Sequence, residues 1–493
     1  MNTYPSVVAS LACLFAPVLG SCAGSASPEP DLQILYERSA QYHMPDRNPV
    51  IVIPGILGSK LVDGDTGQVV WGAFDPEAVD PETPAGARLI SLPIDGDRPL
   101  TELQDSVRAD GVLDRVRVRF FGVPIEIRAY AGILASLGVG GYRDESLGLN
   151  AIDYGDDHFT CFQFAYDWRR DNVENAQRLA AFIAEKKAYV EAIYEEEFGI
   201  EDPEVRFDIV AHSMGGLVGR YFMRYGDADL PADGSLPEVT WAGADMVERL
   251  IVIGAPNAGA LNAFTLLTDG YDGGPFLPNY QGALLGTFPS VYQMLPRPRH
   301  SAILYGDSAE AVDVYDPAVW ERHGWGLSSQ RAADLKVLEA VLPDIESNAA
   351  RREDALLYQA RMLKRAREFH RALDAPAPAP ERAELFLVAG DSTPTLAAVA
   401  IDRETGAHEP AGEAPGDGTV LRSSALLDER RGGAWKPYLD SPVHWSSIMF
   451  LFADHLGLTR DPAFTDNVLY WLLEDPRART RPRTAMSDVQ TPG

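Results

Sequence analysis

The sequence predicts an α/β fold in which a mostly parallel central sheet is flanked by helices. Short runs of β-branched and other apolar residues alternate along the chain with longer segments of helical character. Runs that are apolar throughout are typical of strands buried on both faces, and strands that alternate with helices are typical of a parallel sheet. The chain has 493 residues, of which 46% are hydrophobic and 23% charged, so it is long enough to bury a large core.

Five apolar runs are the expected core strands. A long helix is expected at about 173–198, with acidic and basic residues on its outer face. A second, late helix is expected at 446–456, because Ile448, Phe452 and Leu456 recur at helical spacing, although the same stretch would pass for a buried strand. The expected strands are residues 49–55, 159–166, 207–211, 247–254 and 384–390.

The turn that carries Ser213 is the most specific motif in the chain. Ala211 takes the place of the first glycine in the pattern Gly-x-Ser-x-Gly, and Gly215 keeps the second. A serine hydroxyl becomes a useful nucleophile when a sharp strand-to-helix turn lifts it toward a base and free backbone N–H groups. An ordinary strand followed by a glycine-rich helix start would show the same five residues. The rest of the chain favours Ser213 as a nucleophile.

Six short motifs follow one another along the chain. They are residues 49–61, Tyr-Asp-Trp-Arg at 166–169, Ala-His-Ser-Met-Gly at 211–215, and residues 254–259, 289–296 and 416–420. Together they resemble, in order, the lecithin:cholesterol acyltransferase family, which includes lysosomal phospholipase A2 and phospholipid:diacylglycerol acyltransferases. The resemblance extends from about residue 49 to residue 475 and is thinnest between 71 and 142. It implies an α/β-hydrolase fold with an inserted cap and lid.

The base expected to activate Ser213 is His444. It lies in an irregular stretch just before the expected late helix, where a loop can aim an imidazole at the serine, and it resembles the histidine of the family. His455 is the rival, but inside or at the end of that helix it suits a packing or C-terminal capping role. His212 is adjacent to the serine and is expected to point elsewhere.

The acid expected to orient the histidine is Asp417, in the sequence Gly-Asp-Gly. With Ser213 and His444 it gives the order Ser, Asp, His that is found in α/β-hydrolases. Asp391 is an alternative, because it directly follows the last expected strand. Either aspartate also suits an N-cap or a turn. The resemblance favours Asp417.

The oxyanion of a tetrahedral intermediate requires preorganised donors. In this fold they come from the residue after the nucleophile and from the loop after an early core strand, so the backbone N–H groups of Met214 and Ile56 are expected in this role. Three aromatic residues are expected to bind substrate. Trp71 lies near the position of the family's lid tryptophan, and Tyr166 and Trp168 belong to the Tyr-Asp-Trp-Arg motif. The cysteine pair that bounds the lid in animal members is missing.

The expected domain organisation places a hydrolase core in two parts around a cap. Aromatic and aliphatic residues of the cap are expected either to line an acyl-chain tunnel or to form the cap's own core. The expected segments are a signal peptide at 1–21, a tether and N-terminal segment at 22–45, the core at 46–260 and 384–475, a lid-like insertion at about 71–142, a cap at 261–383 and a disordered tail at 476–493.

The N-terminal segment resembles an export signal. It carries no charged side chain, and its apolar run is too short and too punctuated to span a membrane comfortably. Leu19-Gly-Ser-Cys22 resembles a bacterial lipobox, whose cysteine is lipidated and becomes the mature N-terminus, although the usual Lys or Arg near the start is absent. We expect a lipid anchor at Cys22 and a place in the bacterial cell envelope, in the periplasm or outer membrane; a secreted protein is the alternative.

The composition excludes several classes of partner. Lys and Arg number 43 against 72 Asp and Glu, a formal net charge of −29, which repels nucleic acid. No metal-ligand cluster with recognisable spacing and no phosphate-binding loop occurs, so no metal and no cofactor are expected. The expected partners are a lipid or other ester substrate and, through the anchor, a membrane surface. No protein partner is implied.

The expected function follows from the serine and from the resemblance. It is a lipase or phospholipase A, or an O-acyltransferase, that acts on phospholipids or acylglycerols through an acyl-serine intermediate. Water as acceptor gives a hydrolase and an alcohol gives a transferase, and the catalytic residues are the same for both. The alternatives are an esterase for bulky non-lipid esters or polyesters, and a catalytically silent surface lipoprotein that only binds.

Overall fold

The computed structural model describes residues 30–74, 79–95, 98–113, 115–120, 123–128, 130–155, 157–272 and 278–477. The predicted signal peptide, the lipidation site at Cys22 and the tail beyond residue 477 lie outside these ranges.

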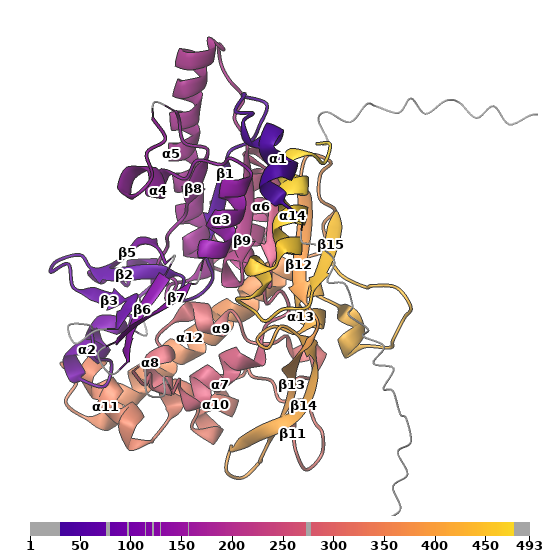
Figure 1. Ribbon diagram of the computed structural model, residues 1–493. Coiled ribbons are helices and arrows are strands. Elements are labelled where there is room, and N and C mark those ends of the chain that lie inside the picture. Colours follow the sequence, from indigo (N-terminus) through magenta and orange to yellow (C-terminus); the bar gives the residue numbers. More distant parts are fainter. Residues whose placement is uncertain are drawn as a thin grey trace, which may run out of the picture.

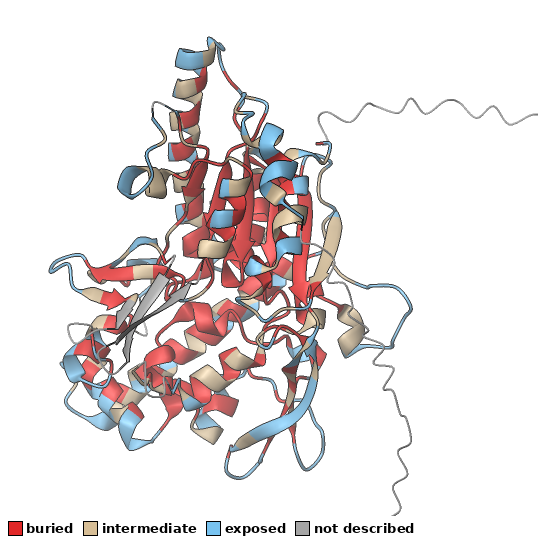
Figure 2. Ribbon diagram, in the orientation of Figure 1, coloured by how far each residue is buried: buried red, intermediate tan, exposed pale blue. Residues whose placement is uncertain are grey.

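A parallel sheet forms the centre of the molecule (Figure 1). In the described part of the chain its strand order is β15-β12-β10-β9-β1-β8, and every neighbouring pair is parallel. The four central strands are buried along their whole length, as shown in red in Figure 2, which explains why they are apolar throughout. The strands are β1 (Val50–Ile53), β8 (Cys161–Gln163), β9 (Phe207–His212), β10 (Val247–Ile253), β12 (Glu384–Gly390) and β15 (Ser447–Leu451).

Helices cover both faces of this sheet. Successive side chains of a strand point to opposite faces, and along β1 the side chains alternate between two hydrophobic clusters. Ile51 and Ile53 pack with the cluster of α5 (Asn172–Phe198) and α6 (Met214–Tyr225). Val50 and Val52 pack with the cluster of α3 (Ala131–Val139) and α14 (Pro462–Leu473). The predicted α/β-hydrolase architecture, with a mostly parallel sheet flanked by helices, is confirmed.

The expected late helix at 446–456 is wrong. Residues Ser447–Leu451 form the edge strand β15, paired in parallel with β12 from Phe386–Ser447 to Gly390–Leu451. Phe452, which helical spacing assigned to the core, is 84% exposed. The open edge of β12 offers backbone partners that a helix cannot use, and this tertiary pairing overrides a short local pattern.

A layer of helices follows β10 and precedes β12, and it lies below the sheet in Figure 1. The helices are α7 (Leu261–Asp269), α8 (Gly282–Leu285), α9 (Pro289–Tyr292), α10 (Pro317–His323), α11 (Ala332–Val341) and α12 (Asn348–Asp374).

A β-hairpin that the sequence did not indicate follows β12. It consists of β13 (Thr393–Ile401) and β14 (His408–Gly416), and β13 also pairs with β11 (Ile303–Tyr305) from the helical layer. Figure 2 shows β14 as largely exposed. The hairpin returns the chain to its starting point, because Asp417 bridges to Thr393. Two further small sheets consist of β2 (Ser59–Asp63), β3 (Val69–Trp71) and β5 (Val107–Val112), and of β4 (Ala73–Phe74), β6 (Arg115–Phe120) and β7 (Val123–Arg128).

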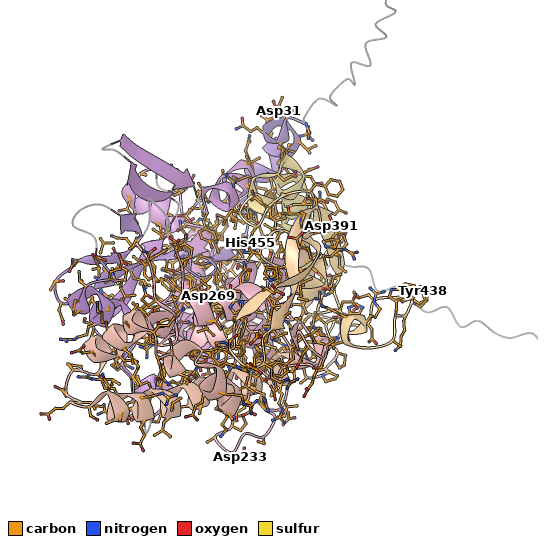
Figure 3. All side chains as sticks on the ribbon, turned by 90° about the horizontal axis from the view of Figure 1, so that it is seen from below. Asp31, Asp233, Asp269, Asp391, Tyr438 and His455 are labelled. Carbon is orange, nitrogen blue, oxygen red and sulfur yellow. The ribbon has the colours of Figure 1, made fainter. Side chains whose placement is uncertain are left out.

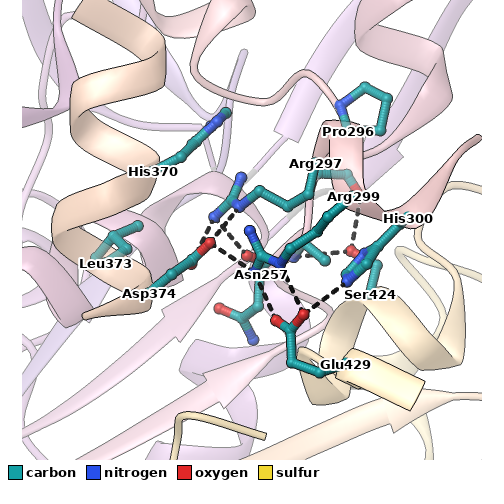
Figure 4. A network of polar contacts seen from close by, with 12 residues as sticks. Asn257, Pro296, Arg297, Arg299, His300, His370, Leu373, Asp374, Ser424 and Glu429 are labelled. Atoms are coloured by element: carbon teal, nitrogen blue, oxygen red, sulfur yellow. Dashed lines mark hydrogen bonds and ion pairs between the residues drawn. The ribbon is translucent and has the colours of Figure 1, made fainter. Parts of the chain in front are cut away.

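A partly buried ion-pair network joins the end of α12 to the core (Figure 4). Asp374 accepts hydrogen bonds from Arg297 Nε at 2.8 Å and from Arg299 Nη2 at 2.8 Å. Arg299 Nε also donates to Glu429 at 2.6 Å, and Arg297 Nη2 donates to the carbonyl of Asn257 at 2.8 Å. Burial alone would raise the pKa of Asp374, but the two arginines outweigh it and lower the pKa.

Within the described residues no helix has the length and apolar character needed to cross a membrane.

Candidate active site

Ser213 occupies the sharp turn between β9 and α6. Its backbone has φ 54° and ψ −128°, a conformation that non-glycine residues rarely adopt and that costs about 1–3 kcal/mol. The Ser213 N–H donates to the carbonyl of Ile253 at the end of β10, at 2.7 Å. The strain therefore occurs at the residue that the sequence indicated as the nucleophile, where it turns the side chain out of the sheet.

Close packing explains the small residues around the turn. A Cβ at Gly215 would lie 2.4 Å from the carbonyl oxygen of Pro54, and one at Gly216 would lie 2.7 Å from Ala255 Cβ. Ala211, by contrast, is an ordinary buried residue of β9. The second glycine of the pattern is thus required here and the first is not.

The imidazole that contacts Ser213 belongs to His455. Its Nε2 lies 3.0 Å from Ser213 Oγ. His455 follows β15 at the carboxyl end of the sheet, and its side chain is 15% exposed. Figure 3 shows it near the centre of the view, far from Tyr438 at the periphery.

The prediction of His444 as the base is therefore corrected to His455. His444 precedes β15, is exposed and lies at the opposite end of this strand. A five-residue strand is about 17 Å long, so the two histidines lie at opposite ends of the sheet's strands. The mistake follows from the wrong secondary structure of 446–456, since a helix there would have turned His455 into a packing residue.

Asp417 holds the other nitrogen of the same imidazole. His455 Nδ1 lies 2.8 Å from Asp417 Oδ2, and Asp417 Oδ1 accepts the N–H groups of Thr419 at 2.9 Å and Val420 at 2.7 Å. Burial raises the pKa of Asp417, but the hydrogen bonds from His455 and these N–H groups prevail and lower it below its usual range. The carboxylate stays ionised, so Nδ1–H donates to it and Nε2 accepts from the Ser213 hydroxyl.

Asp391, the alternative acid, lies apart from this series of contacts. Its carboxylate pairs with Arg422 at 3.8 Å. Asp391 and Asp417 flank the base of the β13–β14 hairpin, which explains why both seemed suitable from their order in the chain.

The two segments expected to form an oxyanion hole lie against the serine. Met214 is the first residue of α6, so its N–H has no carbonyl partner within the helix. The connection from β1 into the first residue of β2, residues 54–59, passes directly over the turn: a Cβ at Gly55 would lie 2.7 Å from Ser213 Cβ. We call this loop the oxyanion loop, since it contains Ile56.

Trp71, Tyr166 and Trp168 do not form an open substrate surface. All three are buried, and their polar atoms donate to main-chain carbonyls of the oxyanion loop. Trp71 Nε1 donates to Leu57 at 2.8 Å, Tyr166 Oη to Pro54 at 2.8 Å and Trp168 Nε1 to Ser59 at 3.1 Å. The structure shows that they support this loop, and their expected role in substrate binding stays a prediction.

Tyr130 is a residue of this site that the sequence did not indicate. Its hydroxyl oxygen accepts the N–H of Gly55 at 2.7 Å and lies 3.3 Å from His212 Nδ1. Tyr130 falls where the family resemblance is thinnest, and no local motif surrounds it. Only the folded chain brings it to the turn.

No group of three or more His, Cys, Asp or Glu side chains in the described ranges is arranged to hold a metal ion.

The sheet order, the strained serine at the carboxyl end of β9 and the contacts of His455 and Asp417 are those of an α/β-hydrolase fold. The family model for lecithin:cholesterol acyltransferase matches residues 148–333, so the resemblance found in the motifs is confirmed. This match includes Ser213 but ends before Asp417 and His455.

Two known proteins give the extent of the similarity. Lecithin-cholesterol acyltransferase-like 4 of Arabidopsis thaliana is 25% identical over 221 residues, which are 40% of this chain and 34% of that protein. The chain thus matches about a third of the length of this relative. The crystal structure of a Tle4-Tli4 complex contains a chain with 14% identity and a TM-score of 0.52, over 86% of this chain and 98% of that one; this likeness concerns the fold.

Proposed function

We propose that this protein is a serine-dependent acyl hydrolase or acyltransferase that acts on the ester bonds of phospholipids or acylglycerols. The observation that carries the proposal is the continuous series of contacts from Ser213 Oγ to His455 Nε2 at 3.0 Å and from His455 Nδ1 to Asp417 at 2.8 Å. The similarity to the lecithin:cholesterol acyltransferase family supports a lipid ester as the substrate.

The first half of the reaction transfers the acyl group to the enzyme. His455 Nε2 takes the proton of Ser213 as the serine oxygen attacks the ester carbonyl. The N–H groups of Ile56 and Met214 donate to the oxyanion that forms, and ionised Asp417 stabilises the charged imidazole. The C–O bond to the alcohol then breaks, and His455 returns the proton to the departing alkoxide. The product is an alcohol and acyl-Ser213.

The second half reverses these roles with a new acceptor. His455 removes a proton from water or from an alcohol, whose oxygen attacks the acyl carbonyl, and the proton then returns to Ser213 as the ester bond breaks. Water gives a free fatty acid, and an alcohol gives a new ester. Both outcomes use the same side chains, which is why the proposal covers a hydrolase and a transferase.

A fluorophosphonate probe tests the nucleophile. We expect covalent labelling of the wild-type protein and none of Ser213→Ala, while Ser328→Ala, a buried serine of the cap segment, keeps the label. If correctly folded wild-type protein is not labelled, the proposal that the protein is an enzyme is contradicted, and a binding protein is favoured.

Product analysis tests the substrate class. Phospholipid and triacylglycerol with labelled acyl chains are incubated with and without an alcohol acceptor, and the labelled products are separated. Labelled fatty acid or labelled ester supports the proposal and separates hydrolase from transferase. If Ser213 reacts with the fluorophosphonate but no lipid is turned over, the result would instead indicate that the substrate is a bulky non-lipid ester or a polyester.

Export and lipid anchoring are proposed from the sequence of the first 22 residues. A bacterial host that expresses the full chain with radiolabelled palmitate should give a labelled membrane-associated protein, and Cys22→Ser should abolish the label. If the protein is unlabelled and is released from the cell envelope, the proposed lipid anchor is contradicted and a cleaved secretory signal is favoured.

A further inference from the structure

We propose that Tyr130 and His212 are positioning residues that connect the oxyanion loop to His455 through one chain of hydrogen bonds. The proposal rests on the function proposed above, and it assigns a role to two buried side chains that the reaction steps leave unused.

Three contacts form the chain. The Gly55 N–H donates to Tyr130 Oη at 2.7 Å, Tyr130 Oη lies 3.3 Å from His212 Nδ1, and His212 Nε2 lies 3.0 Å from the main-chain carbonyl of His455. Tyr130 is 4% exposed and His212 is 2% exposed. Every polar atom of these two side chains is thus used between the oxyanion loop and His455.

The direction of each bond follows from the donors present. Tyr130 Oη accepts from Gly55, so its own hydrogen is available to His212 Nδ1. His212 Nε2–H must then donate to the carbonyl of His455, since a carbonyl only accepts. Burial, reinforced by the neighbouring His455, lowers the pKa of His212 to about 3, so the imidazole stays neutral with one tautomer. Burial also raises the pKa of Tyr130, which keeps its proton.

At one end the chain fixes a peptide plane. Pro54 C=O and Gly55 N–H belong to the same peptide unit; the carbonyl accepts from Tyr166 Oη at 2.8 Å and the N–H donates to Tyr130 at 2.7 Å. A peptide that is held on both sides cannot rotate without losing both bonds. The Ile56 N–H belongs to the next peptide unit, whose carbonyl, that of Gly55, accepts from the Gly58 N–H at 3.1 Å. With both peptide units held, the Ile56 N–H keeps its direction before any substrate binds, which is what electrostatic stabilisation of an oxyanion requires.

At the other end the chain fixes the backbone of the base. The His455 carbonyl accepts from His212, and the His455 N–H donates to the Asp417 carbonyl at 2.9 Å. Both sides of the residue are held, so the imidazole pivots only about its side-chain bonds. Positional errors of about 1 Å in such a group cost about 100-fold in rate.

Tyr130→Phe tests the first half of the chain. It removes the acceptor of Gly55 and the donor to His212 while keeping the ring. We expect kcat per titrated active site to fall by about 10- to 100-fold with little change in KM, and the affinity for a boronic acid, which mimics the tetrahedral intermediate, to fall by a similar factor. The control is Tyr358→Phe, which removes an equally buried hydroxyl from the carbonyl of Thr287 at 2.8 Å and should leave both values unchanged.

His212→Asn tests the second half. The shorter amide remains opposite Tyr130 but does not reach the His455 carbonyl, so kcat should fall in the same range. Because the two residues act in one chain, the double variant should lose little more than the more damaged single variant. A purely structural role would lower the melting temperature and leave the rate per active site unchanged.

The outcomes separate this inference from the proposed function. Active wild-type enzyme whose Tyr130→Phe and His212→Asn variants keep kcat within about twofold, or whose losses multiply in the double variant, overturns the positioning role and leaves the proposed function intact. Folded wild-type protein that neither reacts with the fluorophosphonate nor cleaves any ester overturns the proposed function, and the inference with it, before any variant is made.

Discussion

Asp417 binds His455 twice. Its carboxylate accepts from the imidazole Nδ1–H at 2.8 Å, and its main-chain carbonyl accepts from the His455 N–H at 2.9 Å. One residue therefore determines the tautomer of the ring and the place of the backbone that carries it. The first two predictions follow from this pair.

Replacing His455 should abolish ester cleavage, and replacing His444 should not. His455→Ala removes the base 3.0 Å from Ser213 Oγ, and we expect kcat to fall by about 10⁴-fold or more. His444→Ala changes an exposed residue before β15 and should stay within about twofold. Initial rates on a soluble chromogenic ester measure both, and the reverse result would restore His444 as the base.

Asp417→Asn should lower kcat by about 10⁴-fold, because an amide no longer selects the imidazole tautomer with the proton on Nδ1. Asp391→Asn affects the pair with Arg422, which does not contact His455, and should change kcat by less than about threefold. The same chromogenic assay compares them, with the far-ultraviolet circular dichroism of each variant as the check of folding. Equal losses in the two variants would be inconsistent with the geometry.

Gly215→Ala should displace the oxyanion loop. Its Cβ would lie 2.4 Å from the carbonyl oxygen of Pro54, a backbone atom, so we expect about 1–3 kcal/mol of destabilisation and a loss of about 100-fold in kcat. Gly138→Ala in α3 is the matched control. A Cβ there meets nothing within 4 Å, and removal of a helical glycine should stabilise by about 0.5–1 kcal/mol. Urea unfolding and initial rates measure both effects.

His212 should make the fold sensitive to acid. Its pKa is lowered to about 3 by burial and by His455, whereas an unfolded histidine has a pKa of about 6.5. Between these values the unfolded chain binds the extra proton, so stability falls as the pH drops from about 6.5 toward 3, by about 1.4 kcal/mol per unit.

Urea unfolding at pH 7 and pH 4.5 checks this sign. His212→Asn should be less stable than wild type at pH 7 but should lose about 2–3 kcal/mol less on acidification. His444→Asn, at an exposed position, controls for the removal of a histidine as such. If wild type and His212→Asn lose equal amounts of stability on acidification, the result would contradict a buried neutral imidazole at position 212.

Asp374→Ala should loosen the attachment of α12 to the core. It leaves Arg297, which is 1% exposed, without its carboxylate partner, and breaking a buried pair in this way costs about 3–5 kcal/mol. Lys436→Ala breaks an exposed pair with Asp440 and should cost less than about 1 kcal/mol. Thermal unfolding of the two variants distinguishes them, and similar melting temperatures would show that the network contributes little.

The sequence was sufficient for the parts of the fold that depend on local pattern. Fully apolar runs identified the buried strands, and the small residues around Ser213 identified the turn, because both are direct consequences of burial. β15 could not be identified in this way, since its pairing with β12 is a contact between segments far apart in the chain. The error at 446–456 then led to His444 in place of His455.

The residues that support the site were the hardest to identify from the sequence. Tyr130, Trp71 and Trp168 act through hydrogen bonds to carbonyl and N–H groups of the oxyanion loop. A backbone partner leaves no mark on the sequence at the position it occupies. The motif Tyr-Asp-Trp-Arg therefore marked important side chains, but only the structure shows that they hold the loop.

The β13–β14 hairpin mechanically couples the helical layer to the acid. Its strand β13 pairs with β11 from that layer, its turn accepts a hydrogen bond from Trp325 Nε1 at Gly406 at 2.9 Å, and its base closes at the bridge between Thr393 and Asp417. A rigid-body movement of the whole layer would have to shear this small sheet or pull on Asp417. Access of a long acyl chain to Ser213 is therefore compatible with an intact acid only if the layer yields internally, away from β11.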